Sequence, residues 1–530
     1  MARFEKKEKF SSIILVFLKR FSYHDNRVEL KQNSPISPGQ PPAYFPGSQP
    51  SSPGPTMVSP SPAPTSPTNF SPILPVKSRP KKGILFLVGL VILTIVALII
   101  IIFFKKNLET LTTKTITLTY WGLFEPPSVF QQVIDDYTKT YPKVKINYSQ
   151  ENLKTYRERL QAALARGEGP DIFRMHQTWV PMLGNYLSVV PSTVYDAATF
   201  EEIFYLSAKE NLRRQGQYVG IPLEFDGLAL FYNEDLFRAA GKVPPKTWGE
   251  LKKVACEMTV KDEQGKIRTA GVAMGITSNV DHWSDIFGLM LLQNGADLTN
   301  PALCTKEGGA TVGDGEVCLG RDALTFYTIF AGNQACQEER PEIGAVWDEL
   351  MPSSTYAFAS GSVAMYFGPS WRVFDIKQLN PSLNFKIIPV PQLEGRNISW
   401  ASFWVEAVSK NSKNQKAAWE FLKYLSSKEV LQKLYQTESA LRVFGEPYPR
   451  TDMASLLKGQ PLVGAFIEQA ANAKSWYLSS NTGDNGINEQ IIKYYKDAVN
   501  AVNQGASPLS ALTTAGQGVT QVLRRYGITK

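Results

Sequence analysis

The segment that most constrains this chain is Gly83–Phe104, a run of 22 residues without a charged side chain. Its length is sufficient for one helix to cross the hydrocarbon layer of a bilayer. A signal peptide has a shorter apolar core and a small-residue cleavage site, and this segment has neither. A buried helix of a soluble domain is disfavoured because nothing polar interrupts the run. We therefore interpret residues 83–104 as an uncleaved transmembrane anchor.

Basic side chains indicate the orientation of this anchor. Four Lys and Arg residues lie between positions 77 and 82, whereas two, Lys105 and Lys106, directly follow the anchor. Loops rich in Lys and Arg next to a membrane helix remain in the cytoplasm. The asymmetry predicts a cytoplasmic N-terminus and an extracytoplasmic location for the chain from residue 105 onward.

The net charge of +8 belongs to the N-terminal segment. Residues 1–82 hold 12 Lys and Arg and 4 Asp and Glu, whereas the chain after Lys106 holds 42 basic and 44 acidic residues. The large C-terminal part therefore lacks the positive charge on which nucleic-acid binding depends. We expect no nucleic-acid partner.

Composition divides the chain into four parts. Residues 1–82 include a long stretch rich in Pro, Ser and Gly, which cannot bury enough apolar surface to offset its ordering entropy. They predict a disordered cytoplasmic tail, which is either a spacer or a docking segment for a partner. Residues 83–104 are the expected anchor, residues 105–114 a linker, and residues 115–530 the folded domain.

Strand and helix patterns alternate from Thr115 onward. The segment ITLTYW (116–121) alternates in hydropathy as a strand does, and an amphipathic helix follows it. A second strand, a second helix and a third strand, DIFRM (171–175), come next. This order predicts an α/β domain with parallel strands and helices on both faces of the sheet. Ligands of such sheets bind beyond the carboxyl ends of the strands, which indicates the loops 121–127 and 176–179.

All four cysteines follow the anchor, on the side where disulfides persist. Cys304 and Cys318 flank a Gly-rich loop and are the first candidates for a pair. Whether Cys256 meets Cys336 does not follow from the sequence. Metal binding is disfavoured because no CxxC motif occurs and histidine is scarce.

Six motifs of the outer domain occur in the order typical of extracellular solute-binding protein family 1. They are the opening strand with Trp121–Gly122, GEGPDIFRMHQTW (167–179), VGIPLEFDGLALFYNEDLFRAAG (219–241), TWGEL (247–251), FASGSVAMYFGPSW (358–371) and SKNSKNQKAAWEFLKYL (409–425). Residues from about 115 to 523 thus resemble this family, the sugar receptors of bacterial ABC importers, which includes maltose-binding protein. One departure concerns Ala401–Ser402, where the family often has a pair of glycines.

The resemblance implies a periplasmic-binding-protein type II fold, in which two α/β lobes joined by a hinge enclose a ligand cleft. It places the first lobe at about 115–225 and 383–428, and the second at about 226–382 and 429–530. Gly227 would then lie in the first hinge segment. The resemblance also implies a carbohydrate ligand, an ABC permease with its ATPase as partners, no cofactor and no enzymatic activity. We expect a monomer.

A sugar presents apolar C–H faces and a rim of hydroxyl groups, so its site requires flat aromatic rings and hydrogen-bonding side chains. Asp226 and Trp371 are the leading candidates because they occupy motif positions that line the cleft in the family. The other candidates are the aromatic residues Trp121, Trp283, Phe403 and Trp404 and the polar residues Glu125, His176 and Gln177. Core packing, or a turn in the case of Asp226, is the alternative role. The aromatic residues favour a neutral di- or oligosaccharide, since a phosphorylated ligand would require more Arg near the cleft.

Two other functions compete with this interpretation. A glycoside hydrolase needs two carboxylates across the cleft, for which Glu125, Glu224 and Asp226 are available. The chain contains no GxSxG elbow, P-loop or zinc motif. A membrane-tethered sugar sensor would use the N-terminal tail to report occupancy, although this tail contains no recognisable signalling domain.

Overall fold

A computed structural model describes residues 92–100, 115–306, 316–479 and 485–528. The N-terminal tail, the linker and most of the expected anchor lie outside these residues. The described part of the anchor, residues 92–100, is helical with exposed side chains. Within the described ranges, no helix has both the length and the apolar character needed to cross a membrane. Residues 113–530 form a compact unit of their own.

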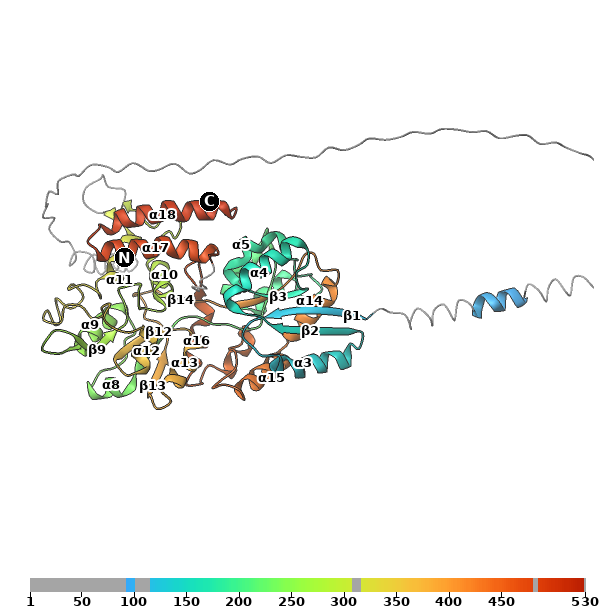
Figure 1. The fold of residues 1–530 in the computed structure, drawn as a ribbon, viewed down its shortest axis with the longest axis horizontal. Coiled ribbons are helices and arrows are strands. Elements are labelled where there is room, and N and C mark those ends of the chain that lie inside the picture. The colour runs from blue at the N-terminus through green and yellow to red at the C-terminus, as the bar shows by residue number, and fades with distance from the viewer. Residues whose placement is uncertain (1–91, 101–114, 307–315, 480–484, 529–530) are drawn as a thin grey trace, which may run out of the picture. The chain divides into compact units, whose positions relative to one another are not determined.

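Two five-stranded sheets organise this unit (Figure 1). The first sheet has the order β2–β1–β3–β15–β6. Its strands are β1 (Ile116–Gly122), β2 (Val144–Gln150), β3 (Ile172–His176), β6 (Ile221–Pro222) and β15 (Trp404–Val408). As the sequence predicts, β1 runs parallel to β2 and β3. In contrast, β15 is antiparallel to β3. It begins beside the carboxyl end of β3, where Trp404 lies opposite His176.

The second sheet has the order β13–β7–β12–β9–β8. Its strands are β7 (Ala229–Asn233), β8 (Val260–Lys261), β9 (Ile267–Val272), β12 (Val363–Gly368) and β13 (Phe385–Ile388). Strand β12 is parallel to β9 but antiparallel to β7, which in turn is antiparallel to β13. The sheets are therefore mixed rather than wholly parallel.

Helices cover the sheets of both lobes. Those of the first lobe are α3 (Pro127–Thr140), α4 (Leu153–Arg166), α5 (Val180–Leu183), α6 (Ala197–Ile203), α7 (Leu206–Asn211), α14 (Gln415–Leu425) and α15 (Lys428–Ser439). Those of the second are α8 (Glu234–Ala239), α9 (Trp248–Met258), α10 (Trp283–Asn294), α11 (Leu319–Thr328), α12 (Ser354–Ala359), α13 (Arg372–Leu379), α16 (Gly464–Gln469), α17 (Ile487–Asn503) and α18 (Pro508–Arg525). Local capping interactions define where some of these helices begin. Thr247, the N-cap of α9, forms a capping box with Glu250.

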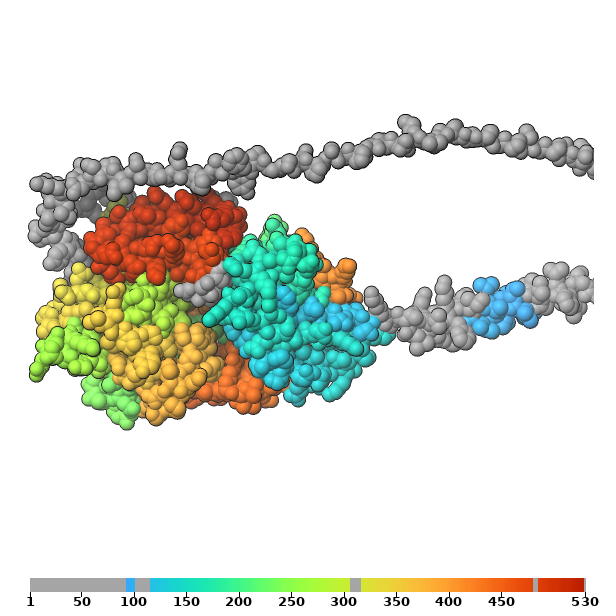
Figure 2. Space-filling view, viewed as in Figure 1, coloured from blue at the N-terminus to red at the C-terminus, as the bar shows by residue number. Residues whose placement is uncertain are grey.

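The expected lobe boundaries near residues 383 and 429 are wrong. Strand β13 lies in the second sheet, because Phe385 pairs with Asn233 of β7. Helix α15 belongs to the first lobe, where it packs beside α3 (Figure 1) and Lys433 forms an ion pair with Asp136. The C-terminal helices α17 and α18 pack against each other and against α10 and α11 of the second lobe. Figure 2 shows them gathered on one side of that lobe. Pairing between distant segments sets these boundaries, which local periodicity does not report.

Two disulfides lie in the second lobe. One joins Cys304 to Cys318, the pair expected from the sequence, and the other joins Cys256 to Cys336. Cys256, on α9, and Cys336, which follows α11, are both fully buried. The second bond therefore lies in the core and links segments 80 residues apart.

Candidate functional site

Two crossing segments between the lobes pair with each other. Gly227 forms an antiparallel bridge with Ala401, and the Leu228 N–H donates to the Trp400 carbonyl at 3.1 Å. A third segment joins them where the Ala401 N–H donates to the Lys474 carbonyl at 2.8 Å. We call these paired segments the hinge, and Gly227 lies in the first of them.

We expect Gly227→Ala to lower the free energy of unfolding by about 1 to 3 kcal/mol. A Cβ atom at this position would overlap the carbonyl oxygen of Trp400, which belongs to backbone and cannot rotate away. Chemical denaturation of the two proteins measures the difference. The matched control is Gly459→Ala, since a Cβ there meets no atom within 4 Å and the backbone at this position does not have a positive φ. Equal stability of Gly227→Ala and wild type would contradict the close packing of the hinge.

Asp226 connects both lobes to the hinge. Its Oδ1 accepts the backbone N–H groups of Gly227 at 2.7 Å and Ser370 at 3.0 Å. Its own carbonyl accepts the N–H of Ser402 at 3.0 Å. Burial raises the pKa of this carboxyl group to about 8, although the donated hydrogen bonds oppose the increase. Asp226 therefore holds Ser370, which directly precedes Trp371 in one lobe, and Ser402, two residues before Trp404 in the other.

Aromatic rings border the hinge on the first lobe. Trp404 is partly buried, and its ring centroid lies 5.3 Å from that of Phe124, 5.3 Å from that of His176 and 5.2 Å from that of Trp179. Phe124, in the loop after β1, is 39% exposed. This cluster brings together the two loops predicted to face the ligand, 121–127 and 176–179.

His176 is fully buried beneath these rings. Its Nδ1 lies 2.7 Å from the Thr178 hydroxyl and its Nε2 lies 3.2 Å from the Ser402 hydroxyl. Burial lowers the pKa of His176 to about 3. His176 is thus a neutral hydrogen-bonding residue of the first lobe, and Ser402, at the departure from the family pattern, supplies one of its partners.

His176 is expected to make the fold sensitive to acid. Below pH 6.5 the unfolded imidazole binds a proton, whereas the folded one does so only near pH 3. His176 should therefore lower the free energy of unfolding of wild type by about 1 kcal/mol between pH 6 and pH 5 relative to a variant without this imidazole, whereas the raised pKa of Asp226 acts in the opposite direction in both proteins. Denaturation midpoints at pH 5, 6, 7 and 8 measure this loss. In His176→Gln the loss should be smaller by that amount, while between pH 7 and 8 both proteins should change in parallel. The same loss below pH 6 in both proteins would contradict the assignment.

The second lobe presents Trp371 at the start of α13. Its side chain is 42% exposed, and the Arg372 guanidinium carbon lies 4.2 Å from the ring centroid. The ring of His282 contacts it edge to face at 5.8 Å. Trp371 is therefore an exposed aromatic platform beside the hinge.

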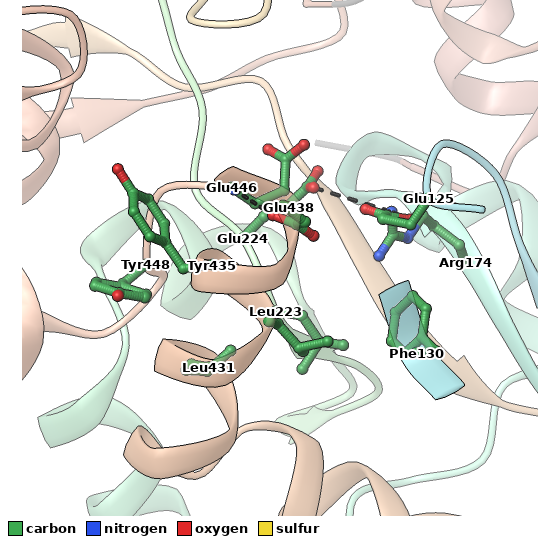
Figure 3. Close-up of a pocket in the computed structure, with 11 residues that line it drawn as sticks. Glu125, Phe130, Arg174, Leu223, Glu224, Leu431, Tyr435, Glu438, Glu446 and Tyr448 are labelled. Carbon is green, nitrogen blue, oxygen red and sulfur yellow. Dashed lines mark hydrogen bonds and ion pairs between the residues drawn. The ribbon is translucent and has the colours of Figure 1, made fainter. Parts of the chain in front are cut away.

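A buried charge cluster lies in the first lobe, close to this site (Figure 3). Arg174 Nη1 donates to both carboxylate oxygens of Glu125, at 2.8 and 2.7 Å, and its Nε donates to Glu406 Oε1 at 2.7 Å. Glu224 Oε2 lies 4.0 Å from Arg174, and Glu224 Oε1 accepts the Trp404 N–H at 3.0 Å. Burial raises the pKa of Glu224 well above its ordinary range, with Glu446 contributing. The cluster thus supports the strand that carries Trp404.

A cavity beside this cluster is lined by four carboxylates, one guanidinium, two tyrosines and four apolar side chains. Figure 3 shows Glu446, Glu438 and Glu224 gathered next to Glu125 and Arg174. The cavity has room for water but not for a sugar. Oxygens of Glu125, Glu224 and Glu446 lie within 4.8 Å of one another, close enough to share a cation. Arg174 and Arg442 already pair with Glu125 and Glu446, respectively.

The remaining candidates occupy less accessible positions. Trp283 is buried in the core on α10, and Phe403 is buried with its ring 6.4 Å from that of Phe225. Gln177 is buried, and its Nε2 donates to the hydroxyls of Ser475 and Ser479. Trp121 is partly buried beneath Arg159, whose guanidinium carbon lies 5.0 Å from the ring. Core packing therefore accounts for Trp283 and Phe403, the alternative weighed from the sequence.

Sequence reasoning missed Arg174, Glu406, Phe124 and Arg372. A charged residue inside the apolar strand DIFRM was a usable signal for Arg174, because a buried charge requires a partner. The partners come from segments up to 232 residues away, so the sequence did not identify them. The carboxylates of Glu125, Glu224 and Asp226 each accept a hydrogen bond from another part of the fold.

Two lobes, paired crossing segments and aromatic rings on both sides of the hinge define a two-lobed binding protein. A sequence profile of the bacterial extracellular solute-binding proteins matches residues 132–443, more than half of the chain. The chain belongs to this family, as its motifs predict.

Individual relatives are distant in sequence. The multiple sugar-binding protein of Streptococcus mutans is 22% identical over 68% of this chain and 81% of its own length. Among solved structures, the sugar-binding protein MalE of Xanthomonas citri is 22% identical with a TM-score of 0.60, covering 77% of this chain and 98% of that protein. The cyclic alpha-maltosyl-1,6-maltose binding protein of Arthrobacter globiformis is 19% identical with a TM-score of 0.59, covering 77% and 99%. At these identities the structural likeness concerns the fold.

Proposed function

We propose that this protein is the membrane-anchored, extracytoplasmic substrate-binding protein of an ABC importer and captures a neutral di- or oligosaccharide between its lobes. The observation that carries the proposal is the position of Asp226. Its hydrogen bonds hold Ser370 and Ser402, and the chain places Trp371 one residue after the first and Trp404 two residues after the second. Aromatic residues of both lobes thus follow closely, along the chain, the partners of one polar hinge residue, and a sugar site combines aromatic rings with polar groups.

The partners follow from the same proposal. An importer supplies a separate permease and ATPase, to which the protein delivers its ligand as a monomer without chemical change. The sugar-binding relatives support a carbohydrate ligand, and the MalE protein of Xanthomonas citri shares the fold. The apolar run 83–104 and the basic residues before it support a single-pass anchor with a cytoplasmic N-terminus. Under this proposal the anchor keeps the binding domain close to the permease.

A thermal-shift screen of the protein against sugars, polyols and amino acids tests the ligand class. A ligand at a hundredfold excess over its dissociation constant stabilises the folded state by about 2.7 kcal/mol. We expect a stabilising oligosaccharide, and we expect Trp371→Ala and Asp226→Ala to weaken its binding at least about tenfold, which corresponds to about 1.4 kcal/mol. Tyr356→Ala, which removes a 55% exposed ring from α12 of the same lobe, is the control and should bind normally.

Other outcomes of the screen would change the proposal. Stabilisation by amino acids alone would retain the fold and replace the substrate. An oligosaccharide that binds Trp371→Ala as tightly as wild type would move the ligand away from this site. Release of smaller sugars from the bound oligosaccharide would establish the hydrolase alternative.

A further inference from the structure

We propose that Arg372 is a positioning residue that orients the Trp371 ring and connects it, through His282 and Asp285, to Trp400 in the hinge. Only the ligand contact of Trp371 rests on the proposed function. The connection itself consists of hydrogen bonds and ring contacts among the described residues. It would transmit a displacement of the ligand-facing ring to the segment about which the lobes move.

Arg372 is held by three groups at once. Its guanidinium carbon lies 4.2 Å from the Trp371 ring centroid, within the range of a cation–π interaction. Its Nε donates to His282 Nε2 at 2.8 Å, and its Nη1 donates to Asp375 Oδ2 at 2.8 Å. A planar guanidinium with two fixed hydrogen bonds has little rotational freedom. The Trp371 ring therefore rests on a fixed surface, and the edge contact of His282 restrains it from the side.

His282 extends the connection into the core. Because Nε2 accepts from Arg372, the proton of the neutral ring lies on Nδ1, which faces Asp285 Oδ2 at 3.4 Å. Asp285 Oδ1 accepts the indole N–H of Trp400 at 2.8 Å. His282, Asp285 and Trp400 are 8%, 7% and 1% exposed. Burial confines all three side chains. A displacement of His282 should therefore reach Trp400 through Asp285.

Trp400 lies in the hinge itself. Its carbonyl accepts the Leu228 N–H, and its indole packs against Gly288 of α10. The backbone at the start of α13 is fastened separately, since the Ser370 N–H donates to Asp226 in the other crossing segment. Trp371 is thus connected to both crossing segments of the hinge. Its backbone connects it to the segment of Asp226, and Arg372 connects it to the segment of Trp400.

Fluorine NMR of the full chain labelled with 5-fluorotryptophan tests the connection without any ligand. The resonances of Trp371 and Trp400 are identified by their loss in Trp371→Phe and Trp400→Phe. If Trp400→Phe does not fold, Asp285→Asn, which removes the charge beside the Trp400 indole, identifies the second resonance. We expect Arg372→Met to shift both resonances. The matched control is Lys377→Met. Lys377 lies on the same helix as Arg372, and its cation is 5.0 Å from the Phe385 ring, so its loss should shift neither tryptophan resonance.

An unchanged Trp371 resonance in Arg372→Met would refute the orienting role, and an unchanged Trp400 resonance would refute the connection to the hinge. If Arg372→Met does not fold, Arg372→Lys serves instead, because it retains the charge and loses the planar contact. It should shift both resonances by a smaller amount, and no shift of either would refute the proposal.

Binding provides a second measurement. For the oligosaccharide found in the screen, we expect Arg372→Met to weaken affinity about two- to fivefold. Failure of every sugar to bind would refute the proposed function but leave the fluorine result decisive for the connection. Shifted resonances with unchanged affinity would restrict Arg372 to a structural role and overturn its assignment as a positioning residue for the ligand.

Discussion

Arg174→Met is expected to lower the free energy of unfolding by about 3 to 5 kcal/mol. Arg174 is 2% exposed and is the shared partner of Glu125 and Glu406. Its removal leaves carboxylates buried without a counter-charge, since Glu406 is fully buried and, among the described residues, only the Tyr120 hydroxyl, at 2.9 Å, is a further donor to it. Urea denaturation followed by circular dichroism measures the loss.

The control for this experiment removes an arginine that is exposed to solvent. Arg159 lies over the Trp121 ring, but its side chain is 47% exposed. We expect Arg159→Met to lower the free energy of unfolding by less than about 1 kcal/mol, because solvent screens the ion pair of Arg159 with Glu151. Glu125→Gln and Glu406→Gln together should recover much of the stability of Arg174→Met by removing the unpaired charges. A loss below 1 kcal/mol in Arg174→Met itself would contradict a buried charge cluster.

Loss of the Cys256–Cys336 disulfide, through replacement of both residues by alanine, should cost about 4 to 5 kcal/mol. The bond closes a loop of 80 residues, and it limits the conformations of the unfolded chain. Denaturation of the oxidised wild type and the double variant measures the effect. The comparison is replacement of Cys304 and Cys318, which close a loop of 14 residues and should cost about 3 kcal/mol. A greater cost for the shorter loop would contradict this account.

Local elements were predictable from the sequence, because adjacent residues determine them. The strands at 116–121 and 171–175 and the helix that follows the first of them form close to the predicted positions. Six motifs in order were enough to predict the family, and Gly227 was placed in the hinge. The neighbour that requires glycine there, the Trp400 carbonyl, lies 173 positions along the chain and has no local signature.

Long-range pairing was the part that could not be predicted. The family resemblance placed strand β13 in the first lobe, yet it pairs with β7 of the second. Trp283 and Trp371 are the same residue type in helical contexts, and one lies in the core while the other is 42% exposed. Periodicity marks an apolar position but does not reveal whether another segment covers it.

The sequence by itself determined the family, the alternation of strands and helices, the uncharged run 83–104 and the identity of the residues at the cleft motifs. Each of these depends on neighbouring residues or on the order of motifs. Only the tertiary structure decided which lobe holds β13 and α15, which aromatic rings are exposed, and that Arg174 and Arg372 organise the surroundings of Trp404 and Trp371. The physical reason is that burial and charge pairing arise between segments tens to hundreds of residues apart, such as Arg174 and Glu406, and these distances exist only in the folded chain.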